Sequence, residues 1–271
     1  MMGARKSASL KGLFFRELYI GRRTYIAVTS IFFGFILLVF LVLLSMKVGN
    51  LAKLPEDVLQ SASGTIRMFG IFVPAALFFM NTSVVVDTAP NDYTEKWTRF
   101  LYSSPVSESK FFFVKYMMML AVAVIGYGLS TVNGVIVGEL MGKPIAYSDF
   151  AVMASIMLVI VFMATLITIL SYWFKSTTYA VVIVLILGYL GMMFLMFASG
   201  VMDENAPEDE TVFLLVGDKV SEISEAILPF SPLVLIAIVA FGWAVTTFVM
   251  KHRDMKPPKF FSKKEKPVNK V

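Results

Sequence analysis

Long apolar stretches alternate with short polar ones along the whole chain. Six stretches are long enough to cross the hydrocarbon core of a bilayer as helices, which takes about 20 residues each. They run over about 24–46, 66–86, 111–138, 150–174, 178–199 and 228–250. Because the runs are too long and too uniformly apolar for barrel strands, helices are expected. The pattern predicts an all-α polytopic membrane protein with six transmembrane helices in one domain, residues 1–250.

Lysine and arginine predict how these helices are oriented, since cytoplasmic loops of membrane proteins are enriched in both. Basic residues gather in residues 1–23, in the loop 87–110 and in the tail 251–271, and they are sparser on the other side. Both termini are therefore expected in the cytoplasm of a multi-pass plasma-membrane protein. The loop 200–227 is acidic and is expected outside the cell, either as a solvated loop or as a cap that repels or releases substrate electrostatically.

The two ends of the chain are expected to contact the cytoplasmic leaflet. Residues 10–23 mix apolar and charged side chains, which predicts an interfacial helix lying on the membrane. The tail 251–271 combines lysines with prolines, and is expected to be disordered and attracted to anionic lipid.

Composition excludes several classes of function. The chain is 58% hydrophobic, with a mean hydropathy of +0.77, and it contains no cysteine. It has a single histidine, His252, and no GxxxxGK[ST] or HExxH motif, so no catalytic centre, metal site or bound cofactor is expected. Carboxylates are lacking in the middle of the apolar runs, which argues against an ion-coupled carrier.

The loop 87–110 is predicted to form its own short helix. Asp92 and Glu95 have the spacing of a helix N-cap and its third position. From Tyr93 onward, aromatic and apolar side chains recur on one helical face, and Lys96 and Arg99 lie off this face. Pro105 is expected to end the helix. The face consists of Tyr93, Trp97, Phe100 and Leu101. Such a helix either lies on lipid or docks a partner protein.

Asp87 precedes this predicted helix, at the end of the second apolar run. A carboxylate at a helix C-terminus faces the negative end of the helix dipole. Either solvent or a basic group on a partner is expected to compensate it.

Polar and small residues inside the runs suggest packing or a pathway. Gly126, Ser130, Gly134 and Gly138 recur every four residues, which favours close helix packing inside the chain or at a subunit interface. Asn81 and Asn133 either hydrogen-bond between helices or line a pathway. Arg67 either extends its side chain to the membrane surface or contacts a substrate carboxylate.

The stretch from Asp87 to Tyr116 resembles the cytoplasmic loop of ABC type-2 exporter permeases. In that family an acidic residue ends the second span, and a helix follows. A proline break with Val or Leu and Ser comes next, and then a Lys shortly into the third span. The matching positions are Asp87, the helix through Trp97 and Leu101, then Pro105, Val106 and Ser107, and finally Lys115 and Tyr116. The six predicted spans and inside termini extend the likeness, and within the family the chain resembles small permeases of Gram-positive bacteria, notably the phenol-soluble-modulin exporters.

The resemblance implies a permease subunit that pairs with a second permease, in a homodimer or heterodimer, on separate ATPase subunits that bind ATP and Mg. The loop helix would be the coupling helix, with Asp87, Asp92, Tyr93, Glu95, Lys96, Trp97, Phe100, Leu101 and Pro105 facing the ATPase. The 18 Met and 25 Phe residues suit an amphipathic or hydrophobic cargo, such as a peptide toxin or antimicrobial peptide. No nucleic-acid partner is expected. The alternatives are an exporter of small drugs or lipids and a membrane scaffold or sensor without transport.

Overall fold

The structure, a computed structural model, describes residues 10–49, 56–93, 107–198 and 212–252. These residues are helical apart from short turns, and no strand occurs among them, so the all-α prediction is confirmed for this part of the chain. The elements are α1 (Leu10–Val48), α2 (Glu56–Phe79), the 3₁₀ helix η2 (Met80–Ser83), α3 (Val84–Tyr93), α5 (Glu108–Leu140), α6 (Tyr147–Phe174), α7 (Thr177–Ala198), α8 (Val212–Ile227), the 3₁₀ helix η3 (Leu228–Phe230) and α9 (Ser231–His252).

Five helical stretches in the described ranges are long and apolar enough to cross a membrane. They are Leu10–Val48, Ser63–Ala89, Glu108–Leu140, Tyr147–Phe174 and Lys219–His252. The protein is therefore a polytopic membrane protein. α7 is also apolar over Thr177–Gly191, a stretch shorter than the five above. The predicted sixth span consequently stays a prediction, as do the orientation and the plasma membrane as its location.

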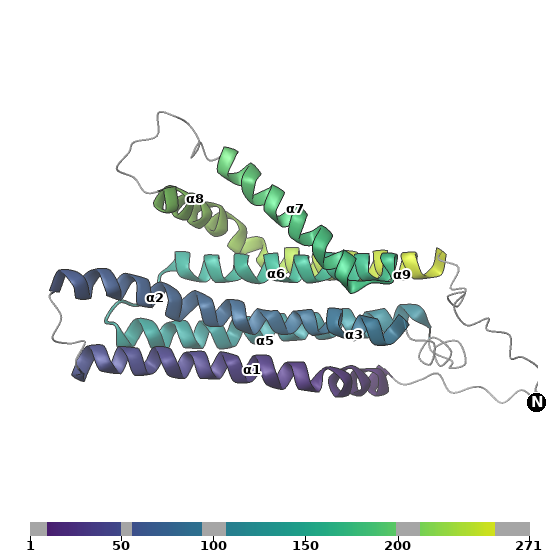
Figure 1. Ribbon diagram of the computed structural model, residues 1–271, viewed down its shortest axis with the longest axis horizontal. Helices are drawn as coiled ribbons and strands as arrows, with labels where there is room; N and C mark the ends of the chain where they lie inside the picture. Colours follow the sequence, from purple (N-terminus) through teal and green to yellow (C-terminus); the bar gives the residue numbers. More distant parts are fainter. Residues whose placement is uncertain (1–9, 50–55, 94–106, 199–211, 253–271) are drawn as a thin grey trace, which may run out of the picture.

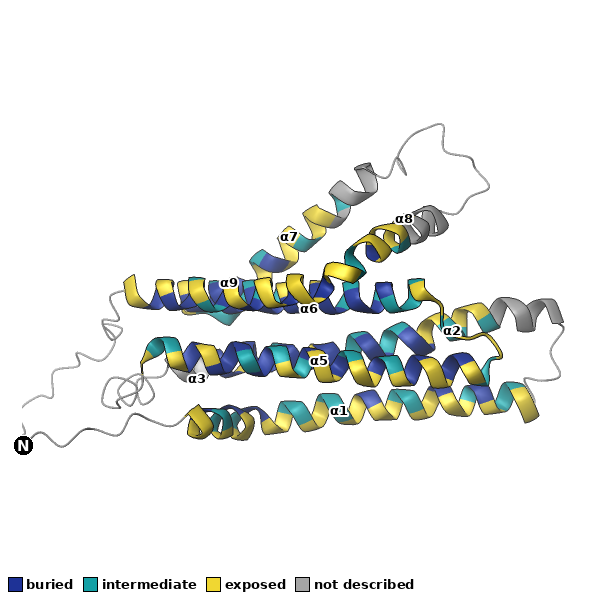
Figure 2. Cartoon of the chain, turned by 180° about the vertical axis from the view of Figure 1, so that it is seen from behind, coloured by how far each residue is buried: buried dark blue, intermediate teal, exposed yellow. Residues whose placement is uncertain are grey.

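The helices form an elongated bundle with α5 and α6 at its centre (Figure 1). α5 packs on α1, α2 and α9, and α6 packs on α2, α7, α8 and α9. Figure 1 shows α7 and α8 diverging from the line of the other helices. The outer faces carry many exposed apolar side chains, while dark buried positions line the contacts between helices (Figure 2). Exposed apolar faces of this kind match the hydrocarbon of a bilayer.

The second span differs from the prediction at its end. It continues from α2 through η2 into α3, and α3 runs to Tyr93. In η2, the hydroxyl groups of Thr82 and Ser83 donate to the carbonyls of Phe79 and Met80, three residues earlier, which matches the tighter 3₁₀ turn. The expected helix start at Asp92 is wrong, because Asp92 already lies in the last turn of α3.

The first helix also differs from the prediction. Residues 10–23 and 24–46 were expected as an interfacial helix and a separate span, but α1 is one helix from Leu10 to Val48. Figure 1 draws its first turns at an angle to the rest. Near this point, a Cβ atom on Gly21 would lie 2.5 Å from Cγ1 of Val84, so the absence of a side chain lets α1 approach α3.

Two tight turns and an extra helix complete the described connections. α5 ends in a Schellman-type turn, with Gly142 at φ 67° and the Lys143 amide donating to the carbonyl of Gly138 at 3.0 Å. α6 ends at Lys175, which adopts φ 55° before α7 begins. The segment 200–227 was predicted as a loop, but its second half forms α8. The apolar residues at the start of α8 are therefore helical.

Candidate functional site

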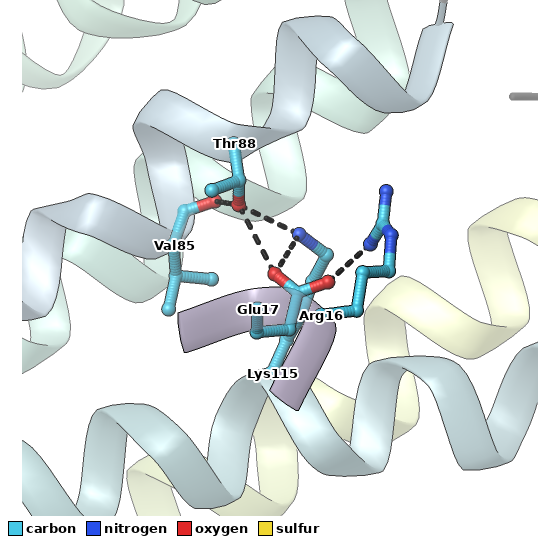
Figure 3. Close-up of polar contacts among 5 residues, drawn as sticks. All are labelled: Arg16, Glu17, Val85, Thr88 and Lys115. Atoms are coloured by element: carbon cyan, nitrogen blue, oxygen red, sulfur yellow. Dashed lines mark hydrogen bonds and ion pairs between the residues drawn. The ribbon is translucent and has the colours of Figure 1, made fainter. Parts of the chain in front are cut away.

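Three polar side chains from three helices meet inside the bundle beside the 87–110 loop (Figure 3). Lys115 on α5 donates from Nζ to Oε2 of Glu17 on α1 at 3.0 Å and to Oγ1 of Thr88 on α3 at 2.7 Å. Thr88 Oγ1 also lies 3.0 Å from the carbonyl oxygen of Val85 and 3.4 Å from Glu17 Oε2. We call Glu17, Thr88 and Lys115 the buried triad.

Glu17 and Lys115 are both buried, so their pairing holds the helices that carry them in fixed positions. Lys115 is 0% exposed and Glu17 is 5% exposed. Charges removed from water to this extent need an opposite charge and hydrogen bonds, because an unpaired buried ion costs several kcal/mol, on the order of the whole stability of a domain. The triad therefore fixes α1, α3 and α5 relative to one another.

A second cation and an aromatic ring extend the triad. Arg16 pairs with Oε1, the other carboxylate oxygen of Glu17. The Arg16 guanidinium and the Lys115 ammonium each lie 5.2 Å from the centroid of the Phe111 ring, within the range of cation–π attraction. Glu17 thus pairs with both cations, and the Phe111 ring lies beside both of them.

The triad is a buried, hydrogen-bonded ion pair that links three helices. The ammonium and carboxylate bind each other, and Lys115 has no contact with solvent. In the described ranges, no group of three His, Cys, Asp or Glu residues is placed to hold a metal ion. Because the triad links three helices, a displacement of α3 would act directly on α1 and α5.

The triad was missed in the sequence, although two signals pointed to it. Lys115 interrupts the apolar run 111–120, and Glu17 is the one acid in a basic N-terminal segment. The side chain of Lys115 is fully buried, although the residue follows the basic loop 87–110. Leu13, Glu17 and Gly21 are all buried and lie four residues apart, so they share the face of α1 that packs inward.

Three of the predicted coupling residues lie in α3, namely Asp87, Asp92 and Tyr93. Asp87 is exposed and lies inside the helical stretch that continues from α2 through η2 to Tyr93, so it is not at a helix C-terminus. The expectation that Asp87 opposes the dipole is therefore wrong. Asp92 and Tyr93 belong to the last turn of α3. Glu95, Lys96, Trp97, Phe100, Leu101 and Pro105 lie outside the described residues.

The small-residue stripe faces other parts of the same chain. Gly126, Ser130, Gly134 and Gly138 are all buried in α5. A Cβ atom on Gly126 would lie 2.6 Å from the Phe78 ring, and one on Gly134 would lie 2.7 Å from Cδ1 of Ile145. The stripe thus packs against α2 and the connection between α5 and α6.

The two asparagines and Arg67 have partners within the chain. Asn133 donates to the Gly70 carbonyl at 2.8 Å, and Asn81 donates to the Phe78 carbonyl at 3.1 Å. Arg67 forms an ion pair with Asp149, with Nη2 2.7 Å from Oδ2. Asn133 therefore joins two helices, whereas Asn81 bonds within its own helical segment.

Comparisons with protein-family models, with curated proteins and with solved structures found no match for this chain.

Proposed function

We propose that the protein is the permease subunit of an ATP-binding-cassette exporter. In this proposal it moves an amphipathic or hydrophobic substrate, such as a peptide, out of the cell, and a separate ATPase subunit binds ATP and Mg and supplies the energy. A second permease subunit completes the complex. The residues from Asp87 to Pro105 form the contact with the ATPase, and the chain itself contributes no catalytic group.

The proposal rests chiefly on how α3 is attached. α3 extends from the second span to Asp92 and Tyr93 and so leads directly into the predicted coupling segment. Thr88, one turn before Asp92, is bonded to Lys115 at 2.7 Å, and Lys115 is bonded to Glu17. A displacement of the coupling segment by the ATPase would therefore be transmitted to α1 and α5 through the buried contacts of Lys115 with Thr88 and Glu17.

Two further features support it. The sequence places Trp97 and Leu101 four residues apart, on one predicted helical face next to α3. Large apolar side chains of this kind are frequent anchors at protein interfaces. In addition, the described apolar spans contain adaptable Met and Phe surface, which suits a hydrophobic or amphipathic cargo better than an ion.

The test is to produce the protein together with candidate ABC ATPase subunits and to purify the complex. We expect a stable complex whose ATP hydrolysis drives uptake of a labelled amphipathic peptide into inverted vesicles. The variant Trp97→Ala/Leu101→Ala should lose transport while its spans remain folded. Thr98→Ala, off the predicted face, is the matched control.

The outcomes separate this function from its alternatives. Failure to purify with any ATP-binding protein would exclude the exporter. ATP-driven movement of a small drug or lipid, with no movement of peptide, would keep the mechanism and replace the cargo. A complex that hydrolyses ATP without moving any cargo would favour a scaffold or sensor.

A further inference from the structure

A pocket of about 200 Å³ lies at the end of the bundle opposite the buried triad. It is formed by the beginning of the second span and by the connection between α5 and α6. Arg67, Lys143 and Asp149 provide its charges, and Met68, Ile71 and Phe72 provide an apolar wall. The charge pattern of the sequence predicts that this end lies outside the cell.

The pocket has a positive surplus. The Asp149 carboxylate is already engaged by the chain, because Oδ2 accepts from Arg67 Nη2 at 2.7 Å and from the Ala146 amide at 2.9 Å. Asp149 thus neutralises Arg67. Lys143 is exposed, has no ion-pair partner among the described residues, and leaves the pocket with one net positive charge.

Arg67 also retains unused hydrogen-bond donors. A guanidinium has five N–H groups, but both bonds of Arg67 use Nη2, to Asp149 and to the Pro144 carbonyl at 3.2 Å. Its Nε is buried and has no partner among the described residues. Nη1 also has no hydrogen bond among the described residues, so its two N–H groups are available to an anion in the pocket.

The basic groups are held on stiff backbone. The turn at Gly142 and the bond from the Lys143 amide to the Gly138 carbonyl fix Lys143 at the end of α5. A Cβ atom on Gly138 would lie 2.9 Å from the Lys143 carbonyl oxygen, so the turn is seated directly on α5. Arg67 is anchored to the same connection through Pro144. A preformed site of this kind loses little conformational entropy when it binds.

We propose that this pocket binds the phosphate group of an anionic amphiphile at the membrane surface. The phosphate contacts Lys143 and the unused donors of Arg67, and the hydrocarbon chain lies along Met68 and Phe72. Anionic phospholipid and free phosphate share this head-group chemistry, and the apolar wall favours the lipid. The site does not depend on the proposed export function, and its test needs no ATPase.

The test uses the full-length protein purified in a neutral detergent. Binding is measured by native mass spectrometry during titration with phosphatidylglycerol, with phosphatidylcholine and with inorganic phosphate. Lys143→Gln removes the surplus charge and should weaken phosphatidylglycerol binding about fivefold, since one basic group near a membrane surface contributes about a factor of this size. Lys143→Arg should restore it.

The matched control is Lys47→Gln. Lys47 is an exposed lysine in the last turn of α1, at the same end of the bundle, and it does not line the pocket (Figure 1). It reports the general attraction of anionic lipid to a basic protein. Equal affinities of the two glutamine variants would overturn the proposal.

The two remaining probes identify the source of the phosphate. If inorganic phosphate binds as tightly as the lipid and is equally weakened by Lys143→Gln, the pocket is a phosphate site and the lipid assignment is overturned. If only phosphatidylglycerol binds with this dependence on Lys143, the amphiphile is supported. If phosphatidylcholine binds equally to the wild type and to Lys143→Gln, the loss of phosphatidylglycerol binding is caused by the lost charge. That result would also support the proposed anionic amphiphile.

Discussion

Asn133 on α5 donates a hydrogen bond of 2.8 Å to the carbonyl oxygen of Gly70 on α2. That carbonyl lies four residues before Pro74, which sits inside α2 and has no N–H to donate to it. The side chain of one helix therefore supplies the donor that the proline removes from another. Membrane helices tolerate proline where a neighbour satisfies the freed carbonyl in this way.

Asn133→Ala should therefore destabilise the protein by about 1 kcal/mol, the size of an interhelical hydrogen bond in a membrane protein. In a Pro74→Ala background, the backbone at this position regains an N–H for the Gly70 carbonyl, so the same Asn133 change should cost clearly less. Unfolding in detergent of the four proteins gives the coupling energy. Equal costs in both backgrounds would show that Asn133 does not serve the proline.

The buried triad predicts a large and non-additive effect. Lys115→Met leaves the Glu17 carboxylate in a buried place with one cation fewer, and should destabilise the protein by about 3 kcal/mol. The double variant Glu17→Leu/Lys115→Met removes both charges and should be more stable than the sum of the single losses predicts. Unfolding in detergent measures the cycle, and Lys110→Met, at an exposed position of α5, is the control. Strict additivity would show that the two charges are not coupled.

Two glycines of α5 should respond oppositely to the same substitution. A Cβ atom on Gly126 would lie 2.6 Å from the Phe78 ring and 3.0 Å from the Phe79 ring, both of which are buried. Gly126→Ala should destabilise the bundle by about 1–3 kcal/mol. Gly128 faces open space, so Gly128→Ala should be neutral, or stabilising by up to about 1 kcal/mol because alanine favours helix. Melting temperatures in detergent would distinguish them, and similar shifts would contradict the tight contact.

Lys175 ends α6 at φ 55°, a conformation that costs a non-glycine residue about 1 kcal/mol. Lys175→Gly should raise the stability by a similar amount, since glycine is the preferred residue at such a helix end. Lys175→Ala removes the same side chain without freeing the backbone and should bring no gain. If alanine stabilises as much as glycine does, the lysine charge and not its backbone is responsible.

The absence of cysteine makes the orientation directly measurable. Lys143→Cys in the α5–α6 connection should react with a membrane-impermeant maleimide in intact cells. Lys110→Cys, at the start of α5, should react only after the membrane is opened. Both lysines are exposed, so the comparison reports the side of the membrane and not burial. The reverse result would overturn the expected cytoplasmic termini.

The pattern of apolar residues was enough to predict the class of the protein and the approximate positions of its membrane helices. A helix in lipid satisfies its own backbone, so an apolar run of sufficient length is enough to predict it. The run predicted over 111–138 is found in α5, Glu108–Leu140, and the run over 150–174 is found in α6, Tyr147–Phe174. The end of the second span was not determined in this way, because the helix continues past the last apolar residue and through Pro90 to Tyr93.

Which polar groups meet could be learned only from how the helices pack. Glu17 and Lys115 are 98 positions apart, and Arg67 and Asp149 are 82 apart. Which face each helix turns inward depends on packing against several neighbours at once, as the contacts at Gly21 illustrate. A lone lysine in an apolar run is compatible with a surface position and with a buried ion pair. The choice between them depends on whether another helix brings a carboxylate within hydrogen-bonding distance.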